Sequence, residues 1–189
     1  MDRTAQTDED LMMLVATADR HAFDVLVKRH LNRVYSLARC MVSRQADAED
    51  VAQDAFTRVW VYGPRWEPGR AAFTTWLHRI VVNCCYDHLR KRSSTEGRQV
   101  EIPDTLSSAD ADSEAQMQGK QRRAEVREAL QGLPERQRMA VTLCYFEGMT
   151  NIQAAEVMDI HIKALEGLLF RARRALRPVL EEKREGEAS

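Results

Sequence analysis

The chain has 189 residues and a formal net charge of −1, from 28 basic and 29 acidic side chains. This length allows one large or two small domains. Aromatic residues make up only 6% of the chain, and the abundance of Ala, Leu, Arg and Glu favours helices over strands. There is no signal peptide and no apolar run of membrane-spanning length, so we expect a cytoplasmic protein.

The charges are segregated along the chain, although their sum is close to zero. Basic side chains cluster over residues 88–98 and again over 160–178, whereas residues 101–119 carry five acids and no Lys or Arg. Two basic faces separated by an acidic segment indicate contact with nucleic acid at two places.

The cysteines show no pattern of a metal or redox site. Cys40, Cys84, Cys85 and Cys144 form no CxxC pair, and no histidine lies at a ligand spacing from them. We therefore expect buried hydrophobic side chains in a reducing compartment, with no metal and no cofactor, and zinc is a remote alternative.

Helical periodicity begins near the start of the chain and predicts a first domain over residues 1–92. Amphipathic helices are expected over 8–18, over 22–42, from an N-cap at Asp47, and over 73–92. Gly63-Pro64 and Pro68-Gly69 bracket a loop that contains Trp66. Four such helices can bury one core together.

The pattern then breaks and resumes. Residues 93–119 are polar, acidic and without apolar periodicity, which indicates a flexible linker. Residues 120–180 again show helical spacing and predict a second small domain, in which Gly148 stops a helix and Pro178 ends the last one. We expect a frayed tail over 181–189. The predicted fold class is therefore all-α, with two helical domains joined by an acidic linker.

The second domain contains a predicted helix-turn-helix over residues 151–173. Thr150 and Gln153 form a capping box that opens its first helix, and Ala155 is small enough for two helices to cross closely. Asp159 can adopt the left-handed conformation that the turn needs. The second helix turns Leu165, Leu168 and Leu169 inward and leaves its other side free to enter a major groove.

Three surfaces could carry function, and each has a structural alternative. For the first it is a soluble acidic face, and for the second it is that Trp76 and Tyr86 are core or boundary aromatics and Asn83 is a helix-surface residue. For the third it is an ordinary helical hairpin whose arginines form a solvated face. Asp50, Gln53 and Asp54 share one helix face, where like charges cost a little stability and suit a basic partner. The 73–92 helix mixes stacking surfaces, an amide and cations, as unpaired bases require; its candidates are Trp76, Arg79, Asn83, Arg90, Lys91 and Arg92. On the last helix, several basic side chains can reach phosphates, and others lie on turns that approach base edges; the candidates are Lys163, Gly167, Phe170, Arg171, Arg173, Arg174 and Arg177.

Taken in order, these motifs resemble a bacterial RNA polymerase sigma factor of the extracytoplasmic-function group. The segments DAEDVAQDAFTRVW, TWLHRIVVNCCYDHLRKR and LPERQRMAVTLCYFEGMTNIQAAEVM followed by LLFRARRALR carry the resemblance. It implies a sigma region 2-like bundle and a region 4-like helix-turn-helix domain. Such a protein binds core RNA polymerase and promoter DNA, is not itself an enzyme, and is usually restrained by an anti-sigma factor.

The resemblance also implies roles for particular residues. Asp50, Gln53 and Asp54 match positions that face the polymerase clamp. Asn83 matches the position beside the pocket for a flipped non-template base, with Trp76 and Arg79 as neighbours and the loop 63–70 closing over that base. The family's groove-facing positions at the minus-thirty-five element correspond to Glu166, Gly167, Phe170 and Arg171, and the linker would thread the channel of emerging RNA.

This chain departs from the family pattern at the reading helix. Glu166 stands where many relatives have Arg or Lys, and Gly167 weakens its helix by ~1 kcal/mol relative to Ala. We hypothesise that Glu166 accepts a hydrogen bond from a cytosine amino group.

Two other classes of protein compete with this interpretation. A stand-alone helix-turn-helix regulator would explain residues 120–180 but gives no role to the acidic face in the first domain. An enzyme acting on DNA would need a clustered nucleophile or a set of metal-binding carboxylates, and the sequence shows neither.

Overall fold

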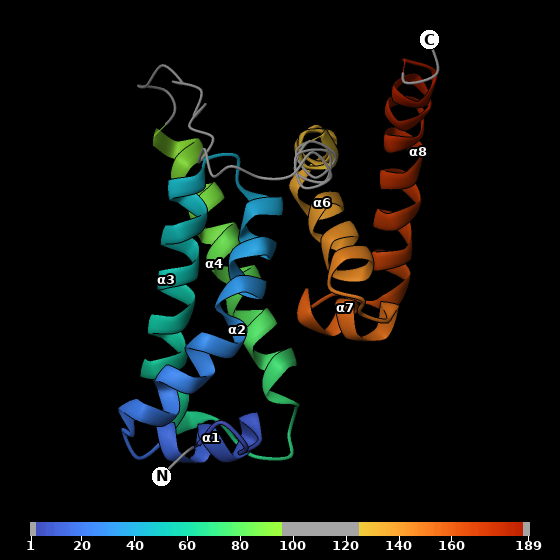
Figure 1. Ribbon diagram of the computed structural model, residues 1–189. Helices are drawn as coiled ribbons and strands as arrows, with labels where there is room; N and C mark the ends of the chain where they lie inside the picture. The colour runs from blue at the N-terminus through green and yellow to red at the C-terminus, as the bar shows by residue number, and fades with distance from the viewer. Residues whose placement is uncertain (1–2, 96–124, 187–189) are drawn as a thin grey trace.

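The computed structural model describes residues 3–95 and 125–186. All regular structure in these two ranges is helical, which confirms the all-α prediction. Two groups of helices lie side by side, one from each range (Figure 1). None of the described helices is long and apolar enough to cross a bilayer. Most of the predicted linker, residues 96–119, lies outside the described residues.

The first group is a four-helix bundle. Three long helices run alongside one another and the short α1 lies across one end (Figure 1). The bundle consists of α1 (Asp8–Val15), α2 (Arg20–Met41), α3 (Gln45–Tyr62) and α4 (Phe73–Thr95), with the 3-10 turn η1 (Gly63–Arg65) after α3. The helix predicted over 8–18 ends earlier, because Ala18 adopts a left-handed φ of 64° that no helix can continue through.

The periodic apolar residues form the core as predicted. On α4, the inward-facing set is almost entirely shielded from solvent: Phe73, Leu77, Ile80, Val81 and Cys84. Gly63 permits a close approach at the end of α3, because a Cβ there would lie 3.0 Å from the Val15 side chain of α1. The apolar spacing therefore determines which faces of α1, α3 and α4 meet.

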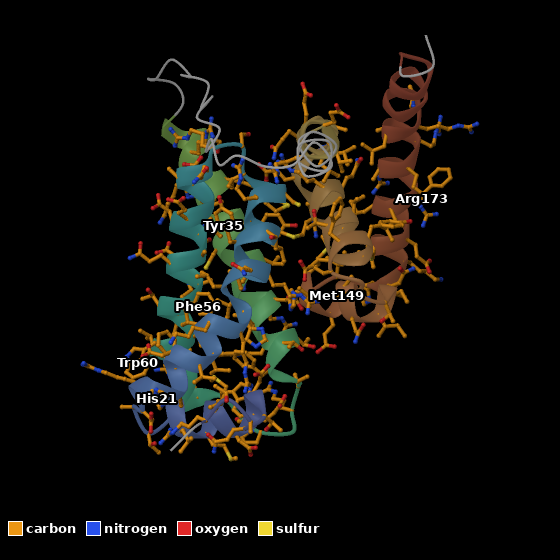
Figure 2. The ribbon with its side chains drawn as sticks, viewed as in Figure 1. His21, Tyr35, Phe56, Trp60, Met149 and Arg173 are labelled. Atoms are coloured by element: carbon orange, nitrogen blue, oxygen red, sulfur yellow. The ribbon has the colours of Figure 1, made fainter. Side chains whose placement is uncertain are left out.

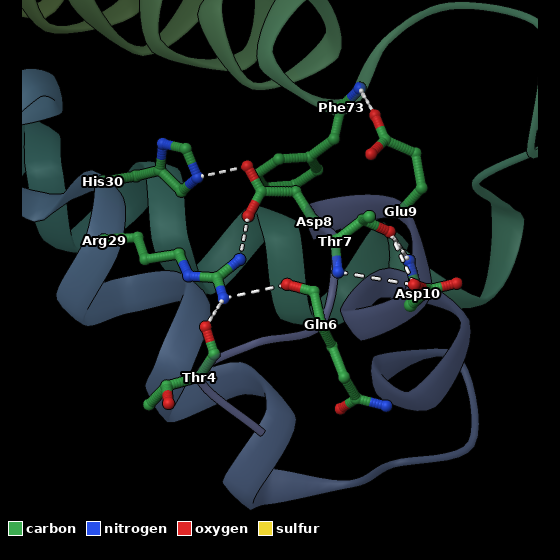
Figure 3. A network of polar contacts seen from close by, with 9 residues as sticks. All are labelled: Thr4, Gln6, Thr7, Asp8, Glu9, Asp10, Arg29, His30 and Phe73. Atoms are coloured by element: carbon green, nitrogen blue, oxygen red, sulfur yellow. Dashed lines mark hydrogen bonds and ion pairs between the residues drawn. The ribbon is translucent and has the colours of Figure 1, made fainter. Parts of the chain in front are cut away.

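Polar contacts fix α1 across the end of the bundle (Figure 3). The Asp8 carboxylate accepts hydrogen bonds from Arg29 and His30 of α2, both at 2.7 Å. The Glu9 carboxylate accepts the backbone N–H of Phe73 at 3.1 Å and so satisfies a donor at the start of α4. Adjacent acids of α1 thus hold two different helices.

Asp47 is not the N-cap that we predicted. Helix α3 begins at Gln45 with Arg44 as its N-cap residue, and Asp47 lies in the first turn with its side chain buried. Its carboxylate accepts hydrogen bonds from Arg44 at 2.6 and 3.0 Å and from Arg92 at 3.1 Å, and His88 lies 3.4 Å away. Asp47 therefore ties the start of α3 to the end of α4, and its contact with Arg92, 45 residues away, outweighs its local capping propensity.

We expect Asp47→Asn to destabilise the first bundle by about 2 kcal/mol, because a buried carboxylate loses its charge while its cations remain. Burial acts to raise the pKa of the Asp47 carboxyl, but hydrogen bonding and charge from Arg44, with the charges of His88 and Arg92, hold this pKa below its usual value. The contribution of Asp47 to the free energy of unfolding is therefore complete above the ordinary pKa of 3.8 and is lost as pH falls through the lowered value. Urea unfolding at pH 7, with the exposed Asp24→Asn as control, measures the effect; equal midpoints would contradict it.

The second group contains the predicted helix-turn-helix. This group begins with a helical segment over residues 125–131. The elements that follow are α6 (Glu135–Val141), a π-helical turn η2 (Thr142–Phe146), α7 (Asn151–Val157) and α8 (Ile162–Gly186). Gly148, at φ 67°, follows the π-helical turn and confirms the predicted stop.

The local geometry of the helix-turn-helix confirms its sequence signals. Thr150 and Gln153 form the reciprocal capping box at the start of α7. Ala155 is buried where α7 and α8 cross, and Asp159 adopts the left-handed conformation with φ 52°. Leu165 and Leu169 of α8 are buried, and Leu168 is partly buried against the same core. The outer side of α8 is consequently left for a ligand.

Pro178 does not end α8, contrary to our prediction. The helix continues through it to Gly186. Proline removes one helical N–H, but residues 179–185 are rich in Leu, Glu, Lys and Arg, which have high helix propensity and favour continuation. The predicted frayed tail is thus helical over 181–186, and 187–189 lie outside the described residues.

Candidate nucleic-acid and polymerase interfaces

The first candidate surface is the acidic face of α3. Asp50, Gln53 and Asp54 are all exposed on one side of the helix, as predicted. Val51 and Ala55, on the opposite side, are buried in the core. The Asp54 charge helps to raise the pKa of Arg58 on the same helix. The exposed position of all three residues on one face still suits a partner outside the bundle.

A shallow groove adjoins this face. It has a volume of about 420 Å³, lies between α2 and α3, and is lined mainly by apolar side chains. Tyr35 and Phe56 line it from the two helices (Figure 2), with Leu31, which is 43% exposed, and Gln53 of the acidic face. Acidic residues next to exposed apolar side chains are typical of a protein-binding surface.

The second candidate surface is a cavity of about 360 Å³ at the N-terminal half of α4. Residues of the loop after α3, including Trp66, line one side, and Trp76 and Arg79 line it from α4. Glu156 of α7 also reaches this cavity. Indole rings beside guanidinium groups can stack on a base and bind its phosphate.

Asn83 lies beyond this cavity rather than in its wall. It is exposed on α4 one turn after Arg79, on the same side of the helix. The structure therefore brings Trp76 and Arg79 together around the cavity and leaves the exposed Asn83 one helical turn beyond Arg79.

The basic end of α4 has two different roles. Arg90 and Lys91 are exposed, and Arg90 also bonds to Asp87 at 2.9 Å. Arg92 is only 19% exposed and bonds to Asp47. Of these predicted DNA contacts, Arg92 is thus engaged in holding the bundle together.

The third candidate surface is the outer side of α8. Lys163, Glu166 and Phe170 are exposed on successive turns of the helix, and Phe170 keeps 60% of its surface in solvent. The Arg174 guanidinium lies over the Phe170 ring, 5.9 Å from its centroid. An apolar ring at a groove-entering position can contact a thymine methyl group, and the stacked cation remains close to the phosphates.

Gly167 has no side chain, and the Arg171 guanidinium covers the surface of α8 beside it. A Cβ at this position would lie 3.7 Å from the guanidinium of Arg171, which folds back over the glycine. Arg173, labelled on α8 in Figure 2, bonds instead to the Tyr145 hydroxyl at 2.9 Å. The predicted groove-facing set therefore lies on one surface, with Arg173 directed to a neighbouring aromatic residue.

Comparison with known proteins identifies both halves of the chain. The model of sigma-70 region 2 matches residues 26–95, and a model of sigma-70 region 4 matches residues 123–176. RNA polymerase sigma-H factor of Pseudomonas aeruginosa is 31% identical over 95% of this chain and 98% of its own length. The chain belongs to the sigma-70 family of sigma factors. Its similarity to the ECF RNA polymerase sigma-E factor of Escherichia coli, 32% identical over 90% of this chain and 92% of the relative, places it in the extracytoplasmic-function group.

Solved structures agree with this assignment. CnrH, in complex with the cytosolic domain of CnrY, covers 93% of this chain with a TM-score of 0.69 and 28% identity, over 97% of its own length. The sigma factor RpoE of Bartonella quintana, in complex with the anti-sigma factor NepR, covers 84% of this chain and 96% of its own, with a TM-score of 0.66 and 25% identity. Relatives that span both groups of helices favour a sigma factor over a stand-alone helix-turn-helix regulator.

Sequence reasoning missed one set of residues in this sigma factor, at the contact between its two groups of helices. Glu147, just after the π-helical turn, bonds to Arg33 of α2 and to His78 of α4. Its partners lie 114 and 69 residues away in the sequence. No local pattern could have indicated this contact.

The cysteines of the sigma factor are unreactive by environment. Cys84 and Cys85 are buried, and Cys40 and Cys144 are partly buried. Burial raises the pKa of all four thiols, that of Cys84 to about 11, which keeps them protonated near neutral pH. Among the described residues, no group of three or more His, Cys, Asp and Glu is arranged to hold a metal ion.

Proposed function

We propose that this sigma factor binds core RNA polymerase through the acidic face of α3, melts the minus-ten element at the α4 cavity and reads the minus-thirty-five element with α8. The observation that carries the proposal is the separation of three chemically different surfaces on two helical groups that match sigma regions 2 and 4. We assign these functions to domains at residues 1–92 and 120–180, with 93–119 as the linker.

The polymerase surface combines charge with apolar area. The carboxylates of Asp50 and Asp54 attract a basic partner and set its orientation, and the groove beside Gln53 accepts apolar side chains. Exposed acids contribute modestly by themselves, so we assign most of the affinity to their combination with the groove.

The melting surface holds an extruded base. Flipping a base costs a few kcal/mol, which stacking on an aromatic ring and hydrogen bonding can offset. Trp76 supplies the ring, Asn83 the hydrogen bonds to a base edge, and Arg79 a cation for the backbone, with Arg90 and Lys91 further along the strand. RNA polymerase performs the chemistry of transcription. This sigma factor supplies promoter choice and strand opening and does not itself catalyse a reaction.

The minus-thirty-five surface combines phosphate contacts with base reading. Lys163, Arg171 and Arg174 neutralise phosphates, and Phe170 contacts a methyl group or base edge. Glu166 is exposed between them and can only accept hydrogen bonds when ionised, as the cytosine amino group requires.

We expect Glu166→Ala to relax base preference at one position of the minus-thirty-five element, by roughly 10-fold or more, because one base contact contributes about 1–3 kcal/mol of discrimination. Selection of promoters from a randomised pool by the reconstituted holoenzyme measures the preference. Lys163→Ala is the matched comparison, since loss of a phosphate contact weakens all sequences alike. An unchanged preference in Glu166→Ala would remove the base-reading role.

Control by an anti-sigma factor in the cytoplasm completes the proposal. The Bartonella quintana relative was solved with an anti-sigma factor and CnrH with the cytosolic domain of CnrY. The exposed apolar groove between α2 and α3 is also a surface that an inhibitor can cover.

Run-off transcription tests the proposal as a whole. Core RNA polymerase with this protein is expected to initiate transcription at discrete promoters within genomic DNA fragments. Core polymerase alone is expected to initiate only at the ends of those fragments. Failure to initiate at any fragment, with core enzyme that is active with another sigma factor, would contradict the function.

A further inference from the structure

The start of α4 has no capping side chain at its N-cap position. Helix α4 begins at Phe73, and the Ala72 carbonyl accepts the first helical hydrogen bond, from the Trp76 N–H at 3.2 Å. Ala72 therefore occupies the N-cap position, where the side-chain oxygen of Ser, Thr, Asp or Asn usually accepts one of the first N–H groups of a helix. Because alanine has no such oxygen, the start of α4 depends on an acceptor from elsewhere in the fold.

Glu9 of α1 supplies this acceptor. Its carboxylate, which is partly buried, accepts the Phe73 N–H at 3.1 Å across a separation of 64 residues (Figure 3). A carboxylate at a helix N-terminus also faces the positive end of the helix dipole. A residue of α1 thus performs the capping of α4.

The Phe73 side chain connects this cap to the melting surface. Phe73 is completely buried, and its ring packs edge-to-face against the His30 imidazole with centroids 5.3 Å apart. His30 is itself bonded to Asp8 of α1 at 2.7 Å. The Phe73 ring also lies 6.2 Å from the ring of Trp76, which lines the α4 cavity. A displacement of Phe73 would therefore disturb the ring that we assign to base stacking.

Helix α1 also contacts the other end of the cavity loop, the segment over residues 66–72 that joins η1 to α4. Gly63 of η1 lies against α1, since a Cβ there would lie 3.0 Å from the Val15 side chain and 3.7 Å from that of Met12. Trp66 and Arg70 of the cavity loop line the cavity. One short helix therefore holds both ends of this loop, by close packing at η1 and by a hydrogen bond at α4.

We propose that Glu9 is a positioning residue for strand opening, whose cap of α4 holds Phe73 and Trp76 in the conformation that receives an extruded base. Glu9 itself touches no base. By fixing the start of α4 and one end of the cavity loop, it reduces the ordering that the site must undergo when the base enters. The inference rests on the proposed melting function of the α4 cavity.

Two conservative variants separate the hydrogen bond from the charge. Glu9→Gln keeps an acceptor oxygen at the same reach and loses the charge, whereas Glu9→Asp keeps the charge and withdraws the carboxylate by one methylene. Permanganate footprinting of the reconstituted holoenzyme on promoter DNA is expected to show open complexes reduced roughly 5-fold for Glu9→Asp, the factor that loss of a helix cap typically gives, and close to wild type for Glu9→Gln. The closed complex and the association with core polymerase are expected to be unchanged in both.

Thr7→Ala is the matched control for loss of stability. It removes a cap hydrogen bond of the same kind from α1 itself, the one that Thr7 accepts from the Asp10 N–H at 3.1 Å, and leaves the Phe73 N–H bonded. We expect a lowered thermal midpoint with a footprint close to wild type. Three results would overturn the positioning role: a wild-type footprint for Glu9→Asp, an equal defect in Glu9→Gln, or an equal defect in Thr7→Ala at a similar thermal midpoint.

Trp76→Ala, checked for folding by circular dichroism, distinguishes this inference from the proposed function. If Trp76→Ala opens promoter DNA normally, the cavity is not the melting surface, and the proposed function fails together with the inference. If Trp76→Ala is defective and Glu9→Asp is normal, the inference alone fails. Defects in both variants, with normal opening by Glu9→Gln and Thr7→Ala, support both proposals.

Discussion

Replacing Asp50, Gln53 and Asp54 together by alanine is expected to abolish association with core RNA polymerase, with a loss of at least ~100-fold in affinity. Asp50 and Asp54 supply two charges and Gln53 an amide that borders the apolar groove. Their combined loss is expected to cost about 3 kcal/mol of binding free energy, and every 1.4 kcal/mol is a factor of ten in affinity. The fold should survive, because all three side chains are exposed and the core side of α3 is unchanged. Alanine also removes an unfavourable like-charge pair from the helix.

Biolayer interferometry with immobilised core polymerase measures this loss, and circular dichroism with a thermal melt establishes that the variant is folded. Asp24→Ala serves as the control for removal of an acid from the same bundle. A folded triple variant that binds with wild-type affinity would remove the polymerase role from the α3 face.

The second large effect concerns strand opening. Asn83→Ala is expected to reduce formation of open complexes roughly 10-fold or more while leaving the initial, closed complex nearly unchanged, because an extruded base that loses its hydrogen-bond partner is held only by stacking. The amide is exposed and supports no contact in the core, so its loss costs little stability.

Permanganate footprinting of unpaired thymines measures opening, and a gel-shift assay with heparin omitted measures the closed complex. Ser93→Ala, an exposed position near the end of α4, is the control. If Asn83→Ala gives a wild-type footprint, Asn83 does not take part in holding the base.

Local signals in the sequence predicted much of this structure. The helical period of α4 identified its buried face, and the capping box of α7 identified where the helix-turn-helix begins. Asp159 was predicted to adopt a left-handed conformation because only a few residue types tolerate it, and it does so at φ 52°. These features depend on residues within a few positions of one another.

Features that depend on distant partners were not predictable in this way. The sequence around Asp47 predicted an N-cap, but the Asp47 carboxylate instead accepts a hydrogen bond from Arg92, 45 residues away, inside the bundle. Glu147 has no local signal in the sequence, and its side chain is buried only because the two helical groups pack together. At Pro178 the local signal gave the wrong prediction. Proline usually ends a helix, but α8 continues through Pro178 because the residues after it have high helix propensity.

The most direct test of the central claim is co-elution of the purified protein with bacterial core RNA polymerase on a sizing column. A sigma factor with the polymerase surface assigned to α3 is expected to move into the polymerase peak at one molecule per core enzyme, and to carry that enzyme to a promoter. A protein that stays in its own peak, while binding duplex DNA unaided, would contradict the account and indicate a regulator that works without the polymerase.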